Sequence, residues 1–169
     1  MLKPQDIYIL LKLLAWGKRD WTYQNLADEL FMSASEVHAG IKRATSARLF
    51  DHHRKVPIKK SLGEFLIHGV QYAFPPIRGD ITRGIATGYA APPLNEYFQI
   101  GEELPPVWPD PEGKLRGYEF SPLYKSVTKA ISNDLKLYEF LALVDAIRDG
   151  KAREKDRAIQ EIKIRLSIK

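Results

Sequence analysis

The sequence predicts a mainly α-helical fold, in which two helical regions flank a long irregular segment. Apolar residues recur every three or four positions in residues 1–74 and again in residues 121–169, as they do on the buried face of a helix. Residues 75–122 hold nine of the eleven prolines and six of the eleven glycines, which interrupt regular structure. Because residues 75–120 are also rich in aromatic side chains, we expect an ordered coil packed on the core, with at most one small hairpin.

Length and composition restrict the class of protein. A chain of 169 residues, 44% of them hydrophobic, suffices for one domain or for a small domain with an appendage. The absence of cysteine excludes disulfides, thiolate metal sites and a cysteine nucleophile. The first residues have no signal-peptide cleavage site, and the apolar run in residues 7–16 is too short to cross a bilayer. We therefore expect a cytoplasmic protein that does not bind membranes.

The net charge of +5 is unevenly distributed. Residues 1–60 contain eleven lysines and arginines against six acidic residues, whereas residues 61–117 contain four against seven. Residues 118–169 contain eleven against eight. The basic excess near the start suits a polyanionic partner such as nucleic acid, although many basic surfaces bind nothing.

Four helices are expected in residues 1–74. The second begins near Thr22, a typical N-cap residue, and the third begins in the stretch LFMSASEVH. There, Ser33 and Glu36 have the spacing of a capping box, and Met32 is placed to fill the space beneath the turn. Ser61, with an acidic residue three positions later, predicts a second capping box at the start of the fourth helix. The intervening segment DHHRKVPIKK predicts a short basic hairpin.

Residues 22–50, TYQNLADELFMSASEVHAGIKRATSARLF, resemble the helix-turn-helix of winged-helix transcriptional regulators, the broad group that includes the MarR type. The residues that carry the resemblance are Leu26, Ala27, Leu30, Met32, Ser33, Ser35, Val37, Ile41, Ala44 and Leu49. The resemblance implies a winged helix-turn-helix domain in residues 1–74, which binds double-stranded DNA. Phe31 and Arg48 depart from the family's pattern, because they stand where it has glycine.

The exposed face of the third helix would enter the major groove, where small residues allow close approach and polar side chains reach base edges. The predicted DNA-binding residues are Tyr23, Gln24, Ser33, Ser35, His38, Ala39, Lys42, Arg43, Ser46, Arg54 and Lys55. The first two would contact the phosphate backbone. The last two, in the hairpin, would enter a neighbouring minor groove or contact its phosphates. The alternative is a purely structural helix corner.

Two features of the middle segment have alternative interpretations. The stretch RGDITRGIATG, residues 78–88, pairs two arginines with three glycines but matches no phosphate-loop motif. It predicts either turns whose arginines hydrogen-bond loop carbonyls or pair with acidic residues, or a small anionic effector site or partner contact. Trp108 is expected to be a buried anchor rather than part of a proline-recognition ligand.

Residues 121–169 predict a long helix capped by Asn133 or Asp134, a break at Gly150 and a final charged helix. This region would mediate dimerisation, bind a protein partner, or simply pack on its own core.

No pattern in the sequence supports catalysis or metal binding. There is no nucleophile elbow and no paired-acid motif, and the adjacent His52 and His53 would point to opposite faces of a strand. We therefore expect no enzymatic activity, no metal and no cofactor. The sequence favours a DNA-binding transcriptional regulator, a repressor that acts as a homodimer. The alternative is a protein-interaction module, or an antitoxin-like partner of a neighbouring protein, in which DNA binding is secondary.

Overall fold

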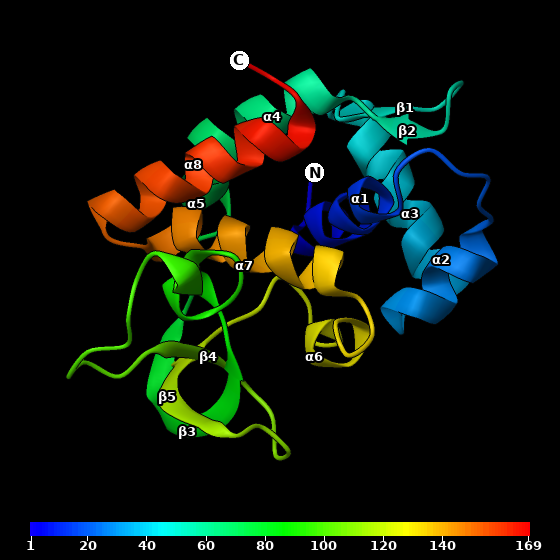
Figure 1. The fold of residues 1–169 in the computed structure, drawn as a ribbon. Helices are drawn as coiled ribbons and strands as arrows, with labels where there is room; N and C mark the ends of the chain where they lie inside the picture. Colours follow the sequence, from blue (N-terminus) through cyan, green and yellow to red (C-terminus); the bar gives the residue numbers. More distant parts are fainter. The chain divides into compact units, whose positions relative to one another are not determined.

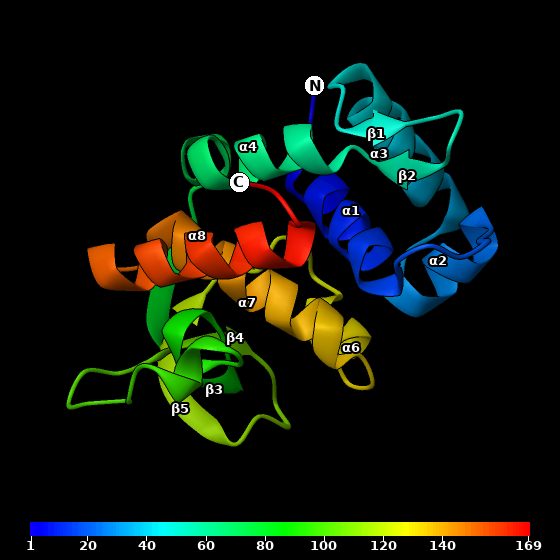
Figure 2. The same ribbon diagram turned by 45° about the horizontal axis from the view of Figure 1, so that its top comes forward.

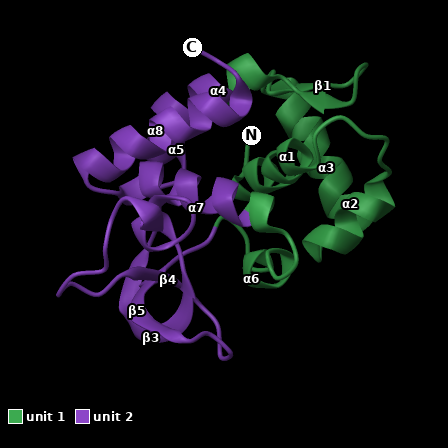
Figure 3. Ribbon diagram, in the orientation of Figure 1, with its two compact units in different colours: residues 1–62, 123–137 green, residues 63–122, 138–169 purple.

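A computed structural model describes residues 1–169 and confirms a mainly α-helical chain with small sheets. The chain divides into two compact units (Figures 1 and 3). Unit 1 comprises residues 1–62 and 123–137, and unit 2 comprises residues 63–122 and 138–169. Unit 1 therefore includes part of the region that the sequence assigned to the C-terminal helices. None of the helices has the length and apolar character that a membrane crossing requires.

Unit 1 contains four complete helices and a short hairpin. Its elements are α1 (Pro4–Trp16), α2 (Tyr23–Leu30), α3 (Ala34–Ser46), β1 (Phe50–Asp51), β2 (Val56–Pro57) and α6 (Val127–Ala130). The strands β1 and β2 are antiparallel. Figure 2 shows this hairpin beyond the C-terminal end of α3, while α2 lies at the other end. Two further helices, α4 (Lys59–His68) and α7 (Leu135–Asp149), begin in one unit and end in the other.

Side-chain caps start α2 and α3 where the sequence predicts them. The hydroxyl of Thr22 accepts a hydrogen bond from the backbone N–H of Asn25 at 3.0 Å. The hydroxyl of Ser33 likewise accepts from the N–H of Glu36 at 3.1 Å. The predicted capping box is only half formed, because the Glu36 carboxylate binds the side chains of Ser33 and Tyr124 rather than the Ser33 backbone.

The prediction for the fourth helix is wrong at its start and in its continuity. The backbone N–H of Leu62 donates to the carbonyl of Ile58, so the first helical turn forms before Ser61. Ser61 lies inside α4 and does not cap it. The helix ends at His68, and after Gly69 a separate short helix, α5 (Val70–Ala73), follows.

The core of unit 1 surrounds α1, whose residues from Ile7 to Leu11 are fully buried. The hydroxyl of Tyr8 donates to the carbonyl of Leu30 at 2.9 Å, and the hydroxyl of Ser126 donates to the same carbonyl at 2.6 Å. A backbone acceptor at the C-terminal end of α2 is thus satisfied by α1 and by the segment that precedes α6. These bonds fix the end of α2, which leads into α3.

Residues 75–120 form a closed three-stranded barrel instead of the predicted ordered coil. Its strands are β3 (Arg78–Ala86), β4 (Pro106–Pro109) and β5 (Leu115–Phe120), and two 3₁₀ turns, η1 (Gly88–Ala90) and η2 (Leu94–Glu96), follow β3. β3 pairs antiparallel with both other strands, whereas β4 and β5 are parallel.

The glycines in this region mark close strand crossings rather than turns. A Cβ atom on Gly84 would lie 2.1 Å from the Trp108 carbonyl oxygen, and one on Gly117 would lie 2.1 Å from the Pro105 carbonyl oxygen. A side chain at either position would collide with backbone. The stretch RGDITRGIATG is therefore mostly strand β3 and not a series of turns. One of its arginines does pair with an acidic residue, since Arg78 lies 2.6 Å from Asp149.

Trp108 is almost fully buried, as predicted, and it anchors the barrel to α7. Its indole N–H donates to Asp145 Oδ2 at 2.8 Å, and Thr87 Oγ1 donates to the same oxygen at 2.7 Å. Arg148 donates to the other carboxylate oxygen at 2.8 Å. Burial raises the pKa of the Asp145 carboxyl, and the guanidinium of Arg148 opposes that shift.

The two helices predicted for residues 121–169, and the break between them, are present. Asp134, rather than Asn133, caps α7, because its carboxylate accepts from the backbone N–H of Leu137 at 3.0 Å. The helix α7 ends just before Gly150, and α8 (Ala152–Leu166) follows.

Candidate nucleic-acid interface

The turn between α2 and α3 adopts a left-handed backbone without glycine. Phe31 has φ 54° and ψ 45°, and the adjacent Met32 is buried beneath the turn, as predicted. Arg48, beyond the end of α3, has φ 62°. Positive φ is unfavourable for such residues because of the Cβ atom. Phe31 and Arg48 therefore adopt the left-handed backbone conformation that glycine favours, and their side chains make this conformation strained.

One face of α3 is buried and the opposite face is open. Val37, Gly40, Ile41 and Ala44 are buried, and a Cβ atom on Gly40 would lie 2.5 Å from Ile9 Cδ1. The exposed positions recur at helical spacing and lie on one stripe: Ser35, His38, Ala39, Lys42 and Ser46. This stripe carries a cation, hydroxyls, an imidazole and a methyl group, and it carries no carboxylate.

Arg43, which the sequence assigned to DNA readout, is instead bound within unit 1. Its Nε and Nη2 atoms each donate to the carboxylate of Asp6 at 2.8 Å. The Asp6 side chain is fully buried and that of Arg43 is 20% exposed. The hydrogen bonds from Arg43 to Asp6 raise the pKa of the guanidinium. This bidentate pair joins α3 to α1 and uses the Nε and Nη2 donors of the guanidinium.

An aromatic stack supports the exposed stripe. The rings of Tyr23 and His38 are stacked, with centroids 4.1 Å apart and an interplanar angle of 22°. The ring of Trp21 packs edge-on against Tyr23, with centroids 5.4 Å apart. Tyr23 is half-buried, so its role in the structure is first to hold His38 in place on α3.

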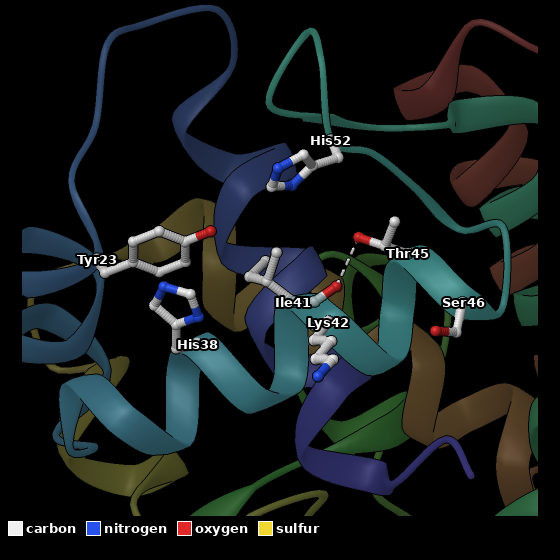
Figure 4. Close-up of a pocket in the computed structure, with 7 residues that line it drawn as sticks. All are labelled: Tyr23, His38, Ile41, Lys42, Thr45, Ser46 and His52. Atoms are coloured by element: carbon white, nitrogen blue, oxygen red, sulfur yellow. Dashed lines mark hydrogen bonds between the residues drawn. The ribbon is translucent and has the colours of Figure 1, made fainter.

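A hollow of about 250 Å³ lies beside this stack (Figure 4). It is lined by Tyr23, His38, Ile41, Lys42, Thr45, Ser46 and His52. The Thr45 hydroxyl donates to the carbonyl of Ile41 at 2.7 Å, which turns the methyl group of Thr45 away from its own helix backbone. The side chain of Lys42 extends away from the Tyr23–His38 stack. The hollow thus combines apolar walls with polar groups at its rim.

A second hollow of about 410 Å³ borders α3 where it approaches the start of the chain. It is lined by Met1, Leu2, Lys42, Arg43, Ser46 and Ala47. Lys42 and Ser46 belong to both hollows. The exposed stripe of α3 therefore forms a ridge with a depression on each side.

The two predicted DNA-contacting cations of the hairpin are both exposed but differ in their contacts. Arg54 is 83% exposed, and its closest carboxylate, that of Asp51, is 4.0 Å away. The ammonium of Lys55 lies 4.6 Å from the centroid of the Trp21 ring and donates to the Trp21 carbonyl at 3.2 Å. The Trp21 indole N–H donates to the Lys55 carbonyl at 3.1 Å. Lys55 thus joins the hairpin to the loop before α2. Arg54 makes no such contact, and its guanidinium is the more accessible of the two cations.

The other predicted contacts differ in their surroundings. Gln24 is exposed and its amide donates to Asp28 at 2.7 Å. The hydroxyl of Ser33 is engaged at the start of α3, where it also lies 3.2 Å from the hydroxyl of Ser35. Ser33 therefore serves the helix cap first.

Three residues of this region do not belong to the predicted DNA-binding set. Thr45 and His52 line the hollow beside α3 but belong to no recognisable spacing pattern. Asp6 precedes its partner by 37 positions, so no local rule could pair the two. No group of three or more His, Asp or Glu side chains is placed to hold a metal ion.

The two units differ in charge. Unit 1 contains fourteen lysines and arginines against seven acidic residues, a net charge of +7 with neutral histidine. Unit 2 contains twelve against fourteen, a net charge of −2. The basic excess of the chain therefore lies entirely in the unit that holds the exposed stripe of α3. No family model, curated protein or solved structure matches the chain significantly.

Proposed function

We propose that this chain is a sequence-specific double-stranded-DNA-binding transcriptional regulator, a repressor that acts as a homodimer. In this proposal α1, α2, α3 and the β1–β2 hairpin form a winged helix-turn-helix, and α3 is its recognition helix. The single observation that carries the proposal is the open, carboxylate-free stripe of α3 on a unit of net charge +7. A structural helix corner also exposes a polar face, so the weight of the argument lies on the absence of carboxylates and on the basic charge of the unit.

The residues of the stripe divide by chemistry. Ala39 is small and exposed, which permits close approach to base edges and contact with a thymine methyl group. Ser35 and His38 supply hydrogen-bonding groups, with His38 held in place by its stack on Tyr23. Lys42 stands between the two hollows and would contact a guanine or a phosphate.

Cations outside α3 would add affinity without sequence information. Arg54 is the best placed of these, since its side chain is 83% exposed. We leave Arg43 out of the proposed contacts, because two of its donors bind Asp6 and its side chain is only 20% exposed. Electrostatic binding of this kind weakens steeply as the salt concentration rises.

The direct test is selection of duplexes from a random pool, followed by fluorescence anisotropy with the enriched duplex. We expect enrichment of a defined sequence, and we expect Lys42→Ala to weaken its binding at least about tenfold. Lys169→Ala, which removes an exposed lysine from unit 2, should leave binding unchanged. Absence of any enriched sequence, or equal behaviour of the two variants, would contradict the assignment of α3.

A further inference from the structure

Two arginines of the barrel face each other without a counter-charge. In the register of β3 and β5, Arg83 lies opposite Arg116, and Ile81 lies opposite Tyr118. Directly opposed residues point to the same face, as do residues two positions apart, so these four side chains share one face. We call it the β3–β5 face. Both arginines are exposed and neither takes part in an ion pair, while Ile81 is 54% exposed.

Like charges directly opposed across a sheet are unfavourable, so the fold alone does not account for this pair. The neighbouring arginine is different, since Arg78 pairs with Asp149 at 2.6 Å and covers the Tyr118 ring at 4.7 Å. The missing counter-charge is therefore confined to Arg83 and Arg116. Guanidinium groups bind carboxylates through paired hydrogen bonds, and a carboxylate placed between the two would relieve their repulsion.

The complementary chemistry lies on another part of the same unit. The connection from η2 to β4 extends away from the helices and strands of unit 2 (Figure 1). We call residues 98–104, FQIGEEL, the arm. Within it, Ile100 is 46% exposed and Leu104 is 37% exposed, and Glu102 and Glu103 are exposed between them. The arm has one ion pair, between Glu103 and Lys151. Both side chains are exposed to solvent, so this pair contributes little stability.

We propose that two copies of the chain associate through two equivalent contacts, with the arm of each lying on the β3–β5 face of the other. Glu102 and Glu103 would approach Arg83 and Arg116, while the apolar side chains of the arm would cover Ile81. A two-fold axis makes such contacts reciprocal, so each copy supplies one arm and one face. A long polyanion is a poorer occupant, because unit 2 carries a net charge of −2.

The test is a charge exchange in the full-length chain, measured by sedimentation velocity. Arg83→Glu with Arg116→Glu reverses the face, and Glu102→Arg with Glu103→Arg reverses the arm. Wild type should dimerise, and each reversed variant alone should dimerise at least about tenfold more weakly, because face and arm now carry like charge. An equimolar mixture of the two variants should recover the dimer, since both of its contacts again join opposite charges. Arg153→Glu, an exposed charge reversal on α8, serves as the matched control.

Circular dichroism of each variant verifies the fold before sedimentation. A monomeric wild type, or reversed variants that dimerise as wild type does, would overturn the proposal. So would a mixture of folded variants that fails to associate. This contact is the interface of the proposed homodimer, so it rests on that part of the proposed function, and a monomeric wild type would overturn both. It uses no residue of α3, so its failure would leave the proposed DNA binding standing, and loss of DNA binding would leave the dimer contact standing.

Discussion

Arg43 and Asp6 form a bidentate ion pair with two hydrogen bonds of 2.8 Å, which joins α3 to α1. The Asp6 side chain is fully buried, so Arg43 provides the counter-charge that a buried carboxylate needs. The adjacent lysine on α3, Lys42, is exposed and has no such partner. Two neighbouring cations of one helix therefore have different functions, one in the stability of unit 1 and the other at its surface.

Removal of the two cations should separate these functions. Arg43→Ala leaves the buried Asp6 carboxylate without a counter-charge, with only the hydrogen bond from the Lys3 backbone N–H, and should lower the free energy of unfolding by about 3 kcal/mol. Lys42→Ala should change it by less than about 0.5 kcal/mol, as is usual for exposed positions. Urea denaturation followed by circular dichroism measures both. Similar losses in the two variants would show that the ion pair does not hold α3.

DNA binding should depend on salt in a way that identifies Lys42. If its ammonium neutralises one phosphate, Lys42→Ala should reduce the slope of log affinity against log salt concentration by about 1. A contact with a base alone would weaken binding but leave the slope largely intact. Titrations at several salt concentrations, with the enriched duplex and with a scrambled duplex, distinguish the two cases.

Phe31 is in the left-handed backbone region at φ 54°, which a Cβ atom disfavours. Phe31→Gly should consequently be more stable than Phe31→Ala by about 0.5–1 kcal/mol, since both variants lack the ring and only glycine avoids the strain. At Ala39, an exposed position inside a helix, glycine should instead be less stable than alanine, so Ala39→Gly should lower the free energy of unfolding by about 1 kcal/mol. Thermal unfolding compares the three variants, and a Phe31→Gly protein less stable than Phe31→Ala would refute the strain.

The hydrogen bond from Tyr124 to Glu36 should be visible in alkaline solution. This bond, at 2.5 Å, raises the pKa of the Tyr124 phenol to about 12. A folded pKa above the unfolded value of about 10 means that the stabilisation is fully present below pH 10 and is lost as the pH rises through 12.

Ultraviolet absorbance of the phenolate tests this. Tyr124→Phe should match the wild-type titration below about pH 11 and lack part of the absorbance gained above it. If the two proteins already differ near pH 10, the Tyr124 phenol does not form its hydrogen bond to Glu36 in solution.

The buried carboxylate of Asp145 should be among the most sensitive positions of unit 2. It accepts hydrogen bonds from Thr87, Trp108 and Arg148, so Asp145→Ala leaves three donors unsatisfied and an arginine without its partner. We expect a loss of about 3 kcal/mol or more in the free energy of unfolding. Asp156→Ala, an exposed substitution on α8, is the control and should change it by less than about 0.5 kcal/mol. Urea denaturation followed by circular dichroism measures the free energy of unfolding of both variants.

Local sequence determined the features that depend on a few neighbouring residues. The caps at Thr22 and Ser33 follow from a hydroxyl three positions before a free backbone N–H, and the exposed stripe of α3 follows from helical spacing. The burial of Met32 and of Trp108 follows from the apolar area of those side chains.

Tertiary structure decided what depends on partners far along the chain. Arg43 looked like a free cation because Asp6 lies 37 positions earlier, and only the packing of α1 against α3 brings the two together. The barrel was missed because its glycines serve close strand crossings, which from sequence look like turns. Residue type and spacing thus determined where α2 and α3 begin and which face of α3 is exposed. The three-dimensional approach of distant segments decided which charges are neutralised and which remain free to bind.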